Sequence, residues 1–149
     1  MSIIQDFSSL SNDLIEMKLS HVWDGYAGTV FLEFGSLTEN KREDGTLGNP
    51  KGLISIGIEW SWQLSDNNSI ICTSEDSEDT WLPILESLVG SKPTRLDFVG
   101  QPMEIEIAFH LNRVLSSLPE EGCEPTWMII DNRSPDAHGF EVKNGKLSY

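Results

Sequence analysis

Residues 54–62 read ISIGIEWSW, and this stretch decides the fold class. Its apolar residues, from Ile54 to Trp62, alternate with smaller or polar ones, and a period of two is typical of a strand that buries one face. Residues 30–34 (VFLEF) alternate in the same way. The two stretches predict strands that share one core, and both Trp60 and Trp62 are expected to pack in that core.

The remaining periodic segments predict a few more strands and two short helices. The helical spacing covers Phe7 to Leu19, with Ser11 as a capping residue, and Thr80 to Val89, with Gly90 past its end. Further strands are expected at 69–74, 95–99, 103–111, 113–118 and 127–131, with turns at 66–68 and 144–145 and a long exposed connection at 38–51. With 149 residues, the chain can bury roughly two-thirds of its unfolded surface. We expect a single α+β domain over residues 1–149, mostly antiparallel sheet with one or two short helices.

The two halves of the chain also resemble each other weakly. Four residues of the first half each match a residue of the second half at a constant offset of 75 positions: Gly25, Val30, Leu32 and Phe34 match Gly100, Ile105, Ile107 and Phe109. A tryptophan strand follows in each half, at Trp60 and at Trp127. Alternating apolar residues also match by chance, so both a duplication and two unrelated hairpins fit the pattern.

The charge of the chain restricts its partners. The formal net charge is −14, with only ten lysines and arginines, whereas binding to phosphate backbones or anionic membranes depends on basic residues. We therefore expect no direct nucleic-acid binding, and no apolar run is long enough for a membrane span. The first ten residues, MSIIQDFSSL, lack the features of an export signal. The sequence predicts a cytoplasmic protein with Cys72 and Cys123 as free thiols, and it leaves the oligomeric state open.

The window from Gly52 to Ser91 contains no lysine or arginine but seven acidic residues. Four of them lie close together ahead of the second predicted helix, at Glu75, Asp76, Glu78 and Asp79. The helix dipole favours one or two carboxylates there, and the others are either solvated or kept for a basic partner. We predict a partner-binding site formed by these four residues, with Asp66 and Glu59 as neighbours.

No catalytic or metal-binding signature is present. His21, His110 and His138 are dispersed, no serine elbow or phosphate loop occurs, and the acidic run lacks the glycine that a calcium loop needs. The two cysteines are 51 positions apart, which does not suit a zinc site. The sequence therefore predicts no catalytic residue, no metal and no cofactor.

Six segments together resemble a known group of proteins. They are residues 28–34 (GTVFLEF), 57–62 (GIEWSW), 70–76 (IICTSED), 81–90, 103–109 (MEIEIAF) and 125–127. The chain resembles small, β-rich bacterial domains that are grouped with the immunity proteins of polymorphic toxin systems. Residues 110–112 (HLN) depart from the acidic-glycine turn that such domains often carry there.

The resemblance implies a non-enzymatic protein that neutralises a cognate toxin, often a nuclease, by covering its surface. The acidity fits this role independently, because a nuclease is basic where it holds phosphates, and opposite charges steer association. A module for another basic protein would show the same charge. Two other hypotheses remain: a small-molecule enzyme with a histidine–carboxylate pair in a pocket, and a structural or oligomerisation domain with a self-complementary apolar patch.

Overall fold

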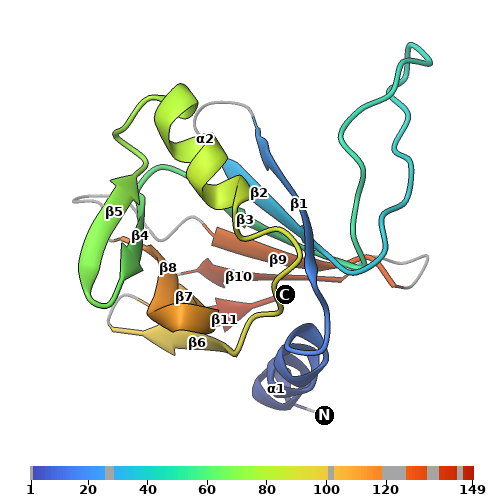
Figure 1. Cartoon of the computed structure of the whole chain (residues 1–149). Helices are drawn as coiled ribbons and strands as arrows, with labels where there is room; N and C mark the ends of the chain where they lie inside the picture. Colours follow the sequence, from blue (N-terminus) through green and yellow to red (C-terminus); the bar gives the residue numbers. More distant parts are fainter. Residues whose placement is uncertain (1, 26–28, 101–102, 119–126, 134–137, 144–145) are drawn as a thin grey trace.

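The computed structural model describes residues 2–25, 29–100, 103–118, 127–133, 138–143 and 146–149. Within these ranges the chain forms two α-helices, eleven strands and a short 3-10 helix at His110–Asn112 (Figure 1). The α-helices and strands are α1 (Ile3–Leu14), β1 (Leu19–Asp24), β2 (Val30–Phe34), β3 (Ile54–Ile58), β4 (Trp62–Asp66), β5 (Ser69–Thr73), α2 (Glu78–Glu86), β6 (Arg95–Val99), β7 (Glu104–Phe109), β8 (Arg113–Ser117), β9 (Trp127–Asp131), β10 (His138–Lys143) and β11 (Lys146–Ser148). This content confirms the predicted α+β class.

The strands form two antiparallel sheets. The first has the order β1-β2-β3-β9-β10-β11, and the second has the order β5-β4-β8-β7-β6. One cluster of buried apolar side chains includes residues from both sheets and both helices. Helix α2 packs against β1 and β5, and α1 packs against β6 and β11, so each helix contacts strands of both sheets.

The two halves of the chain follow the same plan. Helix α1 precedes the meander β1-β2-β3, and the chain then crosses to the other sheet for the hairpin β4-β5. Helix α2 precedes the meander β6-β7-β8, and the chain then crosses back for β9-β10, to which β11 is added. Strands β1 to β5 of the first half thus correspond in turn to β6 to β10 of the second half. Under this correspondence the first sheet, without β11, has the same strand order as the second sheet.

The strand registers agree with this equivalence. Phe34 and Phe109, which the sequence matched, pair with Ile54 and Arg113, the first residues of β3 and β8. Where the halves meet, Trp127 pairs with Ile58 and Trp62 pairs with Ser117, the last residues of the same two strands. The common order and registers favour a duplication over two unrelated hairpins. The tryptophan equivalent to Trp127 is Trp62, however, and not Trp60 as the sequence suggested.

The predicted single strand at 54–62 is wrong, because it is two strands in different sheets. Residues of β3 are all buried, and the chain leaves the first sheet after Ile58 and enters the second at Trp62. Trp60 lies in the crossing with a φ of 64°, a left-handed conformation that breaks the alternation of strand side chains. It is 52% exposed, so the prediction that it packs in the core is also wrong.

The ends of both helices differ from the prediction. Helix α1 begins after Ser2, whose hydroxyl accepts a hydrogen bond from the Gln5 backbone N–H at 3.2 Å, in a capping box. It ends at Leu14, and β1 follows, which the sequence did not predict. A register shift between Leu19 and His21 places the buried residues Leu19 and Val22 three positions apart, which conceals the strand pattern. Helix α2 begins two residues earlier than predicted and includes Pro83.

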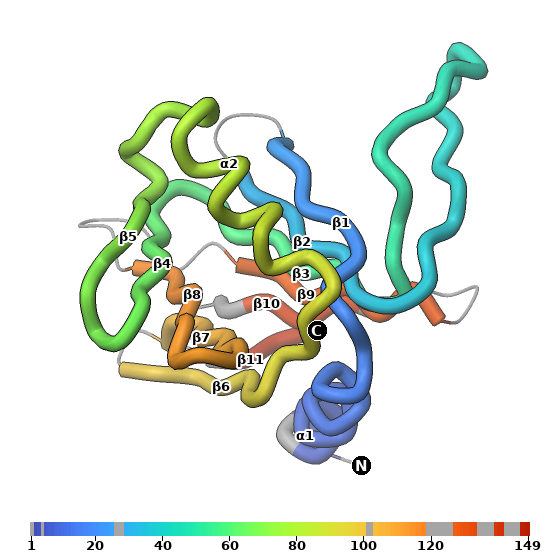
Figure 2. The backbone as a smooth tube through the Cα atoms, viewed as in Figure 1, coloured from blue at the N-terminus to red at the C-terminus, as the bar shows by residue number. Residues whose placement is uncertain are grey.

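The turns agree better with the prediction. Asn67 and Asn68 both have positive φ, as a tight two-residue hairpin turn requires. Residues 38–51 form a long exposed connection closed by bridges between Thr38 and Lys51 and between Lys41 and Leu47. Figure 2 shows that this connection projects away from the rest of the chain. The predicted turn at 144–145 lies outside the described residues, although β10 and β11 on either side of it are paired.

Candidate functional site

The four predicted acidic residues follow β5: Glu75 and Asp76 lie in the loop between β5 and α2, and Glu78 and Asp79 lie in the first turn of α2. We call these four residues the acidic loop (Glu75, Asp76, Glu78 and Asp79). All four side chains are exposed. The start of the loop is fixed to β4, because Ser74 N–H donates to the Trp62 carbonyl at 3.0 Å and Trp62 N–H donates to Ser74 Oγ at 3.1 Å. Since β4 is anchored in the core, the sheet holds the loop in a defined place.

The four carboxylates have different surroundings. Asp76 Oδ2 accepts the backbone N–H of Thr73 at 2.9 Å and so helps to form the turn. Glu78 and Asp79 lie in the first turn of α2, where the free N–H groups and the helix dipole favour negative charge. None of the ion pairs found between described residues includes a member of the acidic loop.

A fifth acidic residue, Asp24, adjoins the acidic loop. It ends β1, and its contact with the Glu78 side chain raises the pKa of Glu78, through a shared hydrogen bond first and through charge repulsion second. Asp24 Oδ1 is buried and has no hydrogen-bond partner among the described residues. Sequence reasoning missed Asp24, because β1 itself was not predicted.

The structure brings Glu59 to the same end of the sheet but not Asp66. Glu59 lies in the crossing, three residues before Trp62, which itself bonds to Ser74. Asp66 ends β4, four residues and about 13 Å beyond Trp62. Its Oδ2 atom lies 3.7 Å from Arg113 Nε in an ion pair. Asp66 therefore belongs to a different part of the surface.

Trp60 lies in the crossing next to Glu59 and has an unusual backbone. A left-handed conformation costs a residue other than glycine about 1–2 kcal/mol, and strained residues cluster at functional sites. Trp60 is also exposed by half, in the crossing that precedes Trp62. An exposed tryptophan beside carboxylates is the kind of residue that anchors protein interfaces.

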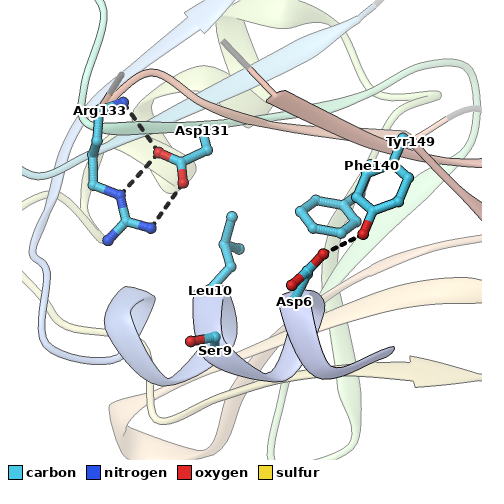
Figure 3. A pocket seen from close by; sticks show the side chains of 7 residues that line it. All are labelled: Asp6, Ser9, Leu10, Asp131, Arg133, Phe140 and Tyr149. Carbon is cyan, nitrogen blue, oxygen red and sulfur yellow. Dashed lines mark hydrogen bonds and ion pairs between the residues drawn. The ribbon is translucent and has the colours of Figure 1, made fainter. Parts of the chain in front are cut away.

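The structure also contains a pocket of about 560 Å³ on the other side of the core, over α1. Figure 3 shows the residues that line it: Asp6, Ser9, Leu10, Asp131, Arg133, Phe140 and Tyr149. Leu10 and Phe140 form an apolar floor, and both are nearly fully buried.

The charged groups of this pocket contact one another. Arg133 Nε and Nη2 donate to the two oxygens of Asp131 at 2.9 and 2.8 Å, and its Nη1 donates to Asp13 at 2.6 Å. These carboxylates raise the pKa of Arg133. The Tyr149 hydroxyl donates to Asp6, which raises the pKa of Tyr149. The charged groups of the pocket and the Tyr149 hydroxyl are therefore already hydrogen-bonded within the chain, although among the described lining residues only Arg133 offsets the negative charge of the carboxylates.

The residues proposed for catalysis are not combined in this pocket. Among its described lining residues there is no histidine. His21 Nε2 lies 3.0 Å from the Asn49 side-chain oxygen, His110 is exposed, and the side chain of His138 lies outside the described residues. No histidine side chain that the structure describes therefore forms a histidine–carboxylate pair in this pocket.

Within the described ranges, the cysteine and the acidic residues indicate no reactive thiol and no metal site. Cys72 is a free, buried thiol whose pKa is raised to about 11 by burial and by the charge of Asp76, so it stays protonated and unreactive at neutral pH. Cys123 lies outside the described residues. Among those residues, no group of three or more His, Cys, Asp or Glu side chains is arranged to hold a metal ion.

No described helix is both long and apolar enough to cross a membrane. Comparisons with family models, with curated proteins and with solved structures find no match to this chain.

Proposed function

We propose that this protein is a non-enzymatic inhibitor of the immunity type, which binds a basic, nuclease-like bacterial toxin through its acidic surface. The observation that carries the proposal is the contact between Glu78 and Asp24 within the acidic loop region. Two carboxylates in contact disfavour the state in which both are charged, and the pKa of Glu78 is raised by the hydrogen bond with Asp24 first and by their charge repulsion second. A lysine or arginine of a partner would relieve it on binding.

The surroundings of the acidic loop support the same function. The exposed Trp60 supplies an aromatic anchor two residues before Trp62, which bonds to Ser74 at the start of the acidic loop. Basic partners are also attracted to a chain of net charge −14. Exposed aromatic residues are typical anchors of protein–protein interfaces, and charged residues are typical of their rims.

The proposal is tested with a basic C-terminal domain of a secreted protein encoded by a neighbouring gene. Glu75→Gln, Glu78→Gln and Asp79→Asn are combined, and Asp76 is left unchanged because it holds the turn through the Thr73 N–H. We expect the association rate constant at low salt to fall about tenfold or more and its salt dependence to flatten. Stopped-flow or surface-based kinetics measure both.

The matched control combines Glu16→Gln, Glu39→Gln and Glu43→Gln, which removes the same charge from exposed positions elsewhere. We expect this variant to keep most of the wild-type association rate, because the local contact is intact. Equal losses in the two variants would mean that only net charge matters. Unchanged kinetics in the first variant would remove the acidic loop from the interface, and no binding by the wild-type protein would contradict the proposed function.

Glu78→Gln alone separates stability from binding. The pKa of Glu78 is higher in the folded protein than in the unfolded chain. The folded protein therefore loses stability as the pH rises from the pKa of the unfolded chain through the higher pKa of the folded state, and this loss persists at neutral pH. We therefore expect the variant to gain thermal stability relative to the wild type at pH 7 but not at pH 4, while its affinity for the basic domain falls. Thermal unfolding at both pH values and a binding titration check this. A loss of stability at pH 7 would contradict the repulsion between Glu78 and Asp24.

A further inference from the structure

The two sheets have four edge strands, and these edges differ in charge. Edge strands expose unpaired backbone groups, and proteins commonly protect them with charged residues, proline, bulges or a covering element. Strand β1 carries Asp24, β6 carries Arg95 and Asp97, and β11 carries Lys146. Helix α2 contacts both β1 and β5, so the difference between the edges is one of charge. Among the four edges that the structure describes, only β5, which reads SIICT, has no charged residue.

Strand β5 also exposes large apolar side chains. Ile70 is 59% exposed and Ile71 is 39% exposed, whereas Cys72 beside them is buried. Two adjacent β-branched residues of this kind on an uncharged edge are typical of a strand that pairs with another chain. A register shift opposite Leu64 and Ser65 forms a bulge at Ile71, which bends the strand and limits the length that a partner can pair with.

We infer that β5 is a docking strand, to which an extended segment of the basic partner adds as a further strand of the second sheet, with its lysines or arginines beside the acidic loop. This inference rests on the proposed function and names how the partner is held. The acidic loop starts two residues after β5 ends, so backbone pairing and charge attraction act on one continuous segment. The partner's apolar side chains cover Ile70 and Ile71.

Charge complementarity selects this occupant over a second copy of the chain. Two copies that pair through β5 would bring together chains of net charge −14 each, and the repulsion opposes association at low salt. A basic segment gains attraction under the same conditions. If the partner segment runs antiparallel to β5, its N-terminal end lies opposite Thr73, next to the acidic loop. Its basic residues are then expected at the N-terminal end, and its apolar residues follow them.

Three substitutions of Ile70 distinguish strand addition from simple charge attraction. Ile70→Glu and Ile70→Lys both place a charge on the edge, and Ile70→Thr keeps a β-branched residue there. For the basic domain used above, we expect the dissociation constant to rise about tenfold or more for both charged variants and only a few-fold for Ile70→Thr. Isothermal titration measures each constant, and circular dichroism checks the fold.

The matched control is Val99→Glu, at the opposite edge of the same sheet. Val99 is 47% exposed and lies four strands from β5, which is about 19 Å. We expect it to leave the dissociation constant unchanged. If Ile70→Glu tightens binding while Ile70→Lys weakens it, charge alone acts at this position and the inference is overturned. Unchanged binding in both charged variants overturns it as well.

A second arm tests the edge without the toxin domain. The peptide Lys-Lys-Thr-Val-Thr-Val-Thr is titrated into the wild-type protein, beside a version with alternate backbone N–H groups methylated. We expect saturable amide shifts in residues 69–73 by NMR with the first peptide and none with the second, since methylation removes the pairing donors. Equal shifts with both peptides, or none in β5, overturn the inference even where the basic domain binds.

Sedimentation of the protein alone completes the test. We expect a monomer, and a dimer that Ile70→Glu dissociates would assign the edge to a second copy and overturn the proposed occupant. If the peptide pairs with β5 but the basic domain does not bind at all, the proposed function fails while the edge is retained as a strand-docking surface.

Discussion

Trp62 and Trp127 occupy equivalent positions in the two halves of the chain. Each is the first residue of a strand that the chain enters after crossing between the sheets, and each is 1% exposed. Trp62 packs edge-on against Trp81 of α2 at a ring distance of 5.3 Å, and Trp127 stacks on Phe98 of β6 at the same distance. The positions that the halves share are therefore those that build the core.

The positions that differ carry polar groups and surface features. Glu33 of β2 is buried and accepts hydrogen bonds from Trp23 Nε1, the Gly52 N–H and Ser55 Oγ. Its counterpart in β7 is Ala108, whose paired residue is Val114 in place of Ser55. The long connection at 38–51 likewise corresponds to the short turn at 110–112. The comparison teaches that the shared strand plan tolerates different chemistry between and within its strands.

The largest expected effect tests the equivalence of the two tryptophans. We expect Trp62→Ala and Trp127→Ala each to lower the free energy of unfolding by about 3–5 kcal/mol, because each opens a large cavity in the core. Urea unfolding measures both values. A large loss in one variant with less than about 1 kcal/mol in the other would break the equivalence.

The polar pair of the first half comes next. We expect Glu33→Ala to lower the free energy of unfolding by about 3 kcal/mol, because three donors lose a charged acceptor in a buried site. The double variant Glu33→Ala with Ser55→Val introduces the pair that the second half carries. We expect it to recover part of the loss, since one donor to Glu33 is removed and Asn132 Nδ2, which also donates to Ser55 Oγ, keeps its bond to the Gly52 carbonyl. Urea unfolding of both variants checks this. A double variant less stable than Glu33→Ala would show that the halves are not interchangeable at this pair.

A smaller difference sharpens the tryptophan comparison. Trp127 Nε1 donates to the Met103 carbonyl at 3.2 Å, whereas the buried Trp62 Nε1 has no partner among the described residues. Replacement by phenylalanine therefore strands an acceptor only at Trp127. We expect Trp127→Phe to cost about 1 kcal/mol more than Trp62→Phe, as thermal or urea unfolding would show. Equal costs would mean that the Trp127 hydrogen bond adds nothing net.

The sequence predicted those parts of the fold that obey a simple period. Strands β2, β3 and β7 alternate regularly, and the offset of 75 was visible because the first helix and first two strands of each half are spaced alike. Beyond Phe34 the long connection changes the spacing, and Trp62 and Trp127 are 65 positions apart. The constant offset of 75 therefore does not extend to Trp62 and Trp127, and their equivalence could not be recognised from it.

Features that depend on contacts between distant segments were not predictable. The crossing at Trp60 looks like continued alternation in the sequence, since only the left-handed backbone ends the strand. The position of the acidic loop was predicted from its composition. The contact between Glu78 and Asp24 was not predicted, because it requires α2 to pack against β1, and these two residues are 54 positions apart in the sequence. Likewise, nothing in residues 59–66 indicates that Glu59 lies in the crossing before β4, whereas Asp66 lies at the far end of that strand.

The exchange of strands between the sheets has a consequence for the synthesis of the chain. Strand β3 pairs with β9 and β4 pairs with β8, so neither sheet can be completed from one half alone. In a nascent chain that has emerged only as far as α2, β3 lacks its neighbour β9 and β4 lacks its neighbour β8. Both pairings form only after residues 113–131 have been translated. Such long-range pairing slows folding and exposes apolar edges meanwhile. The first sheet can therefore close only after β9 has left the ribosome, and the second only after β8 has left it.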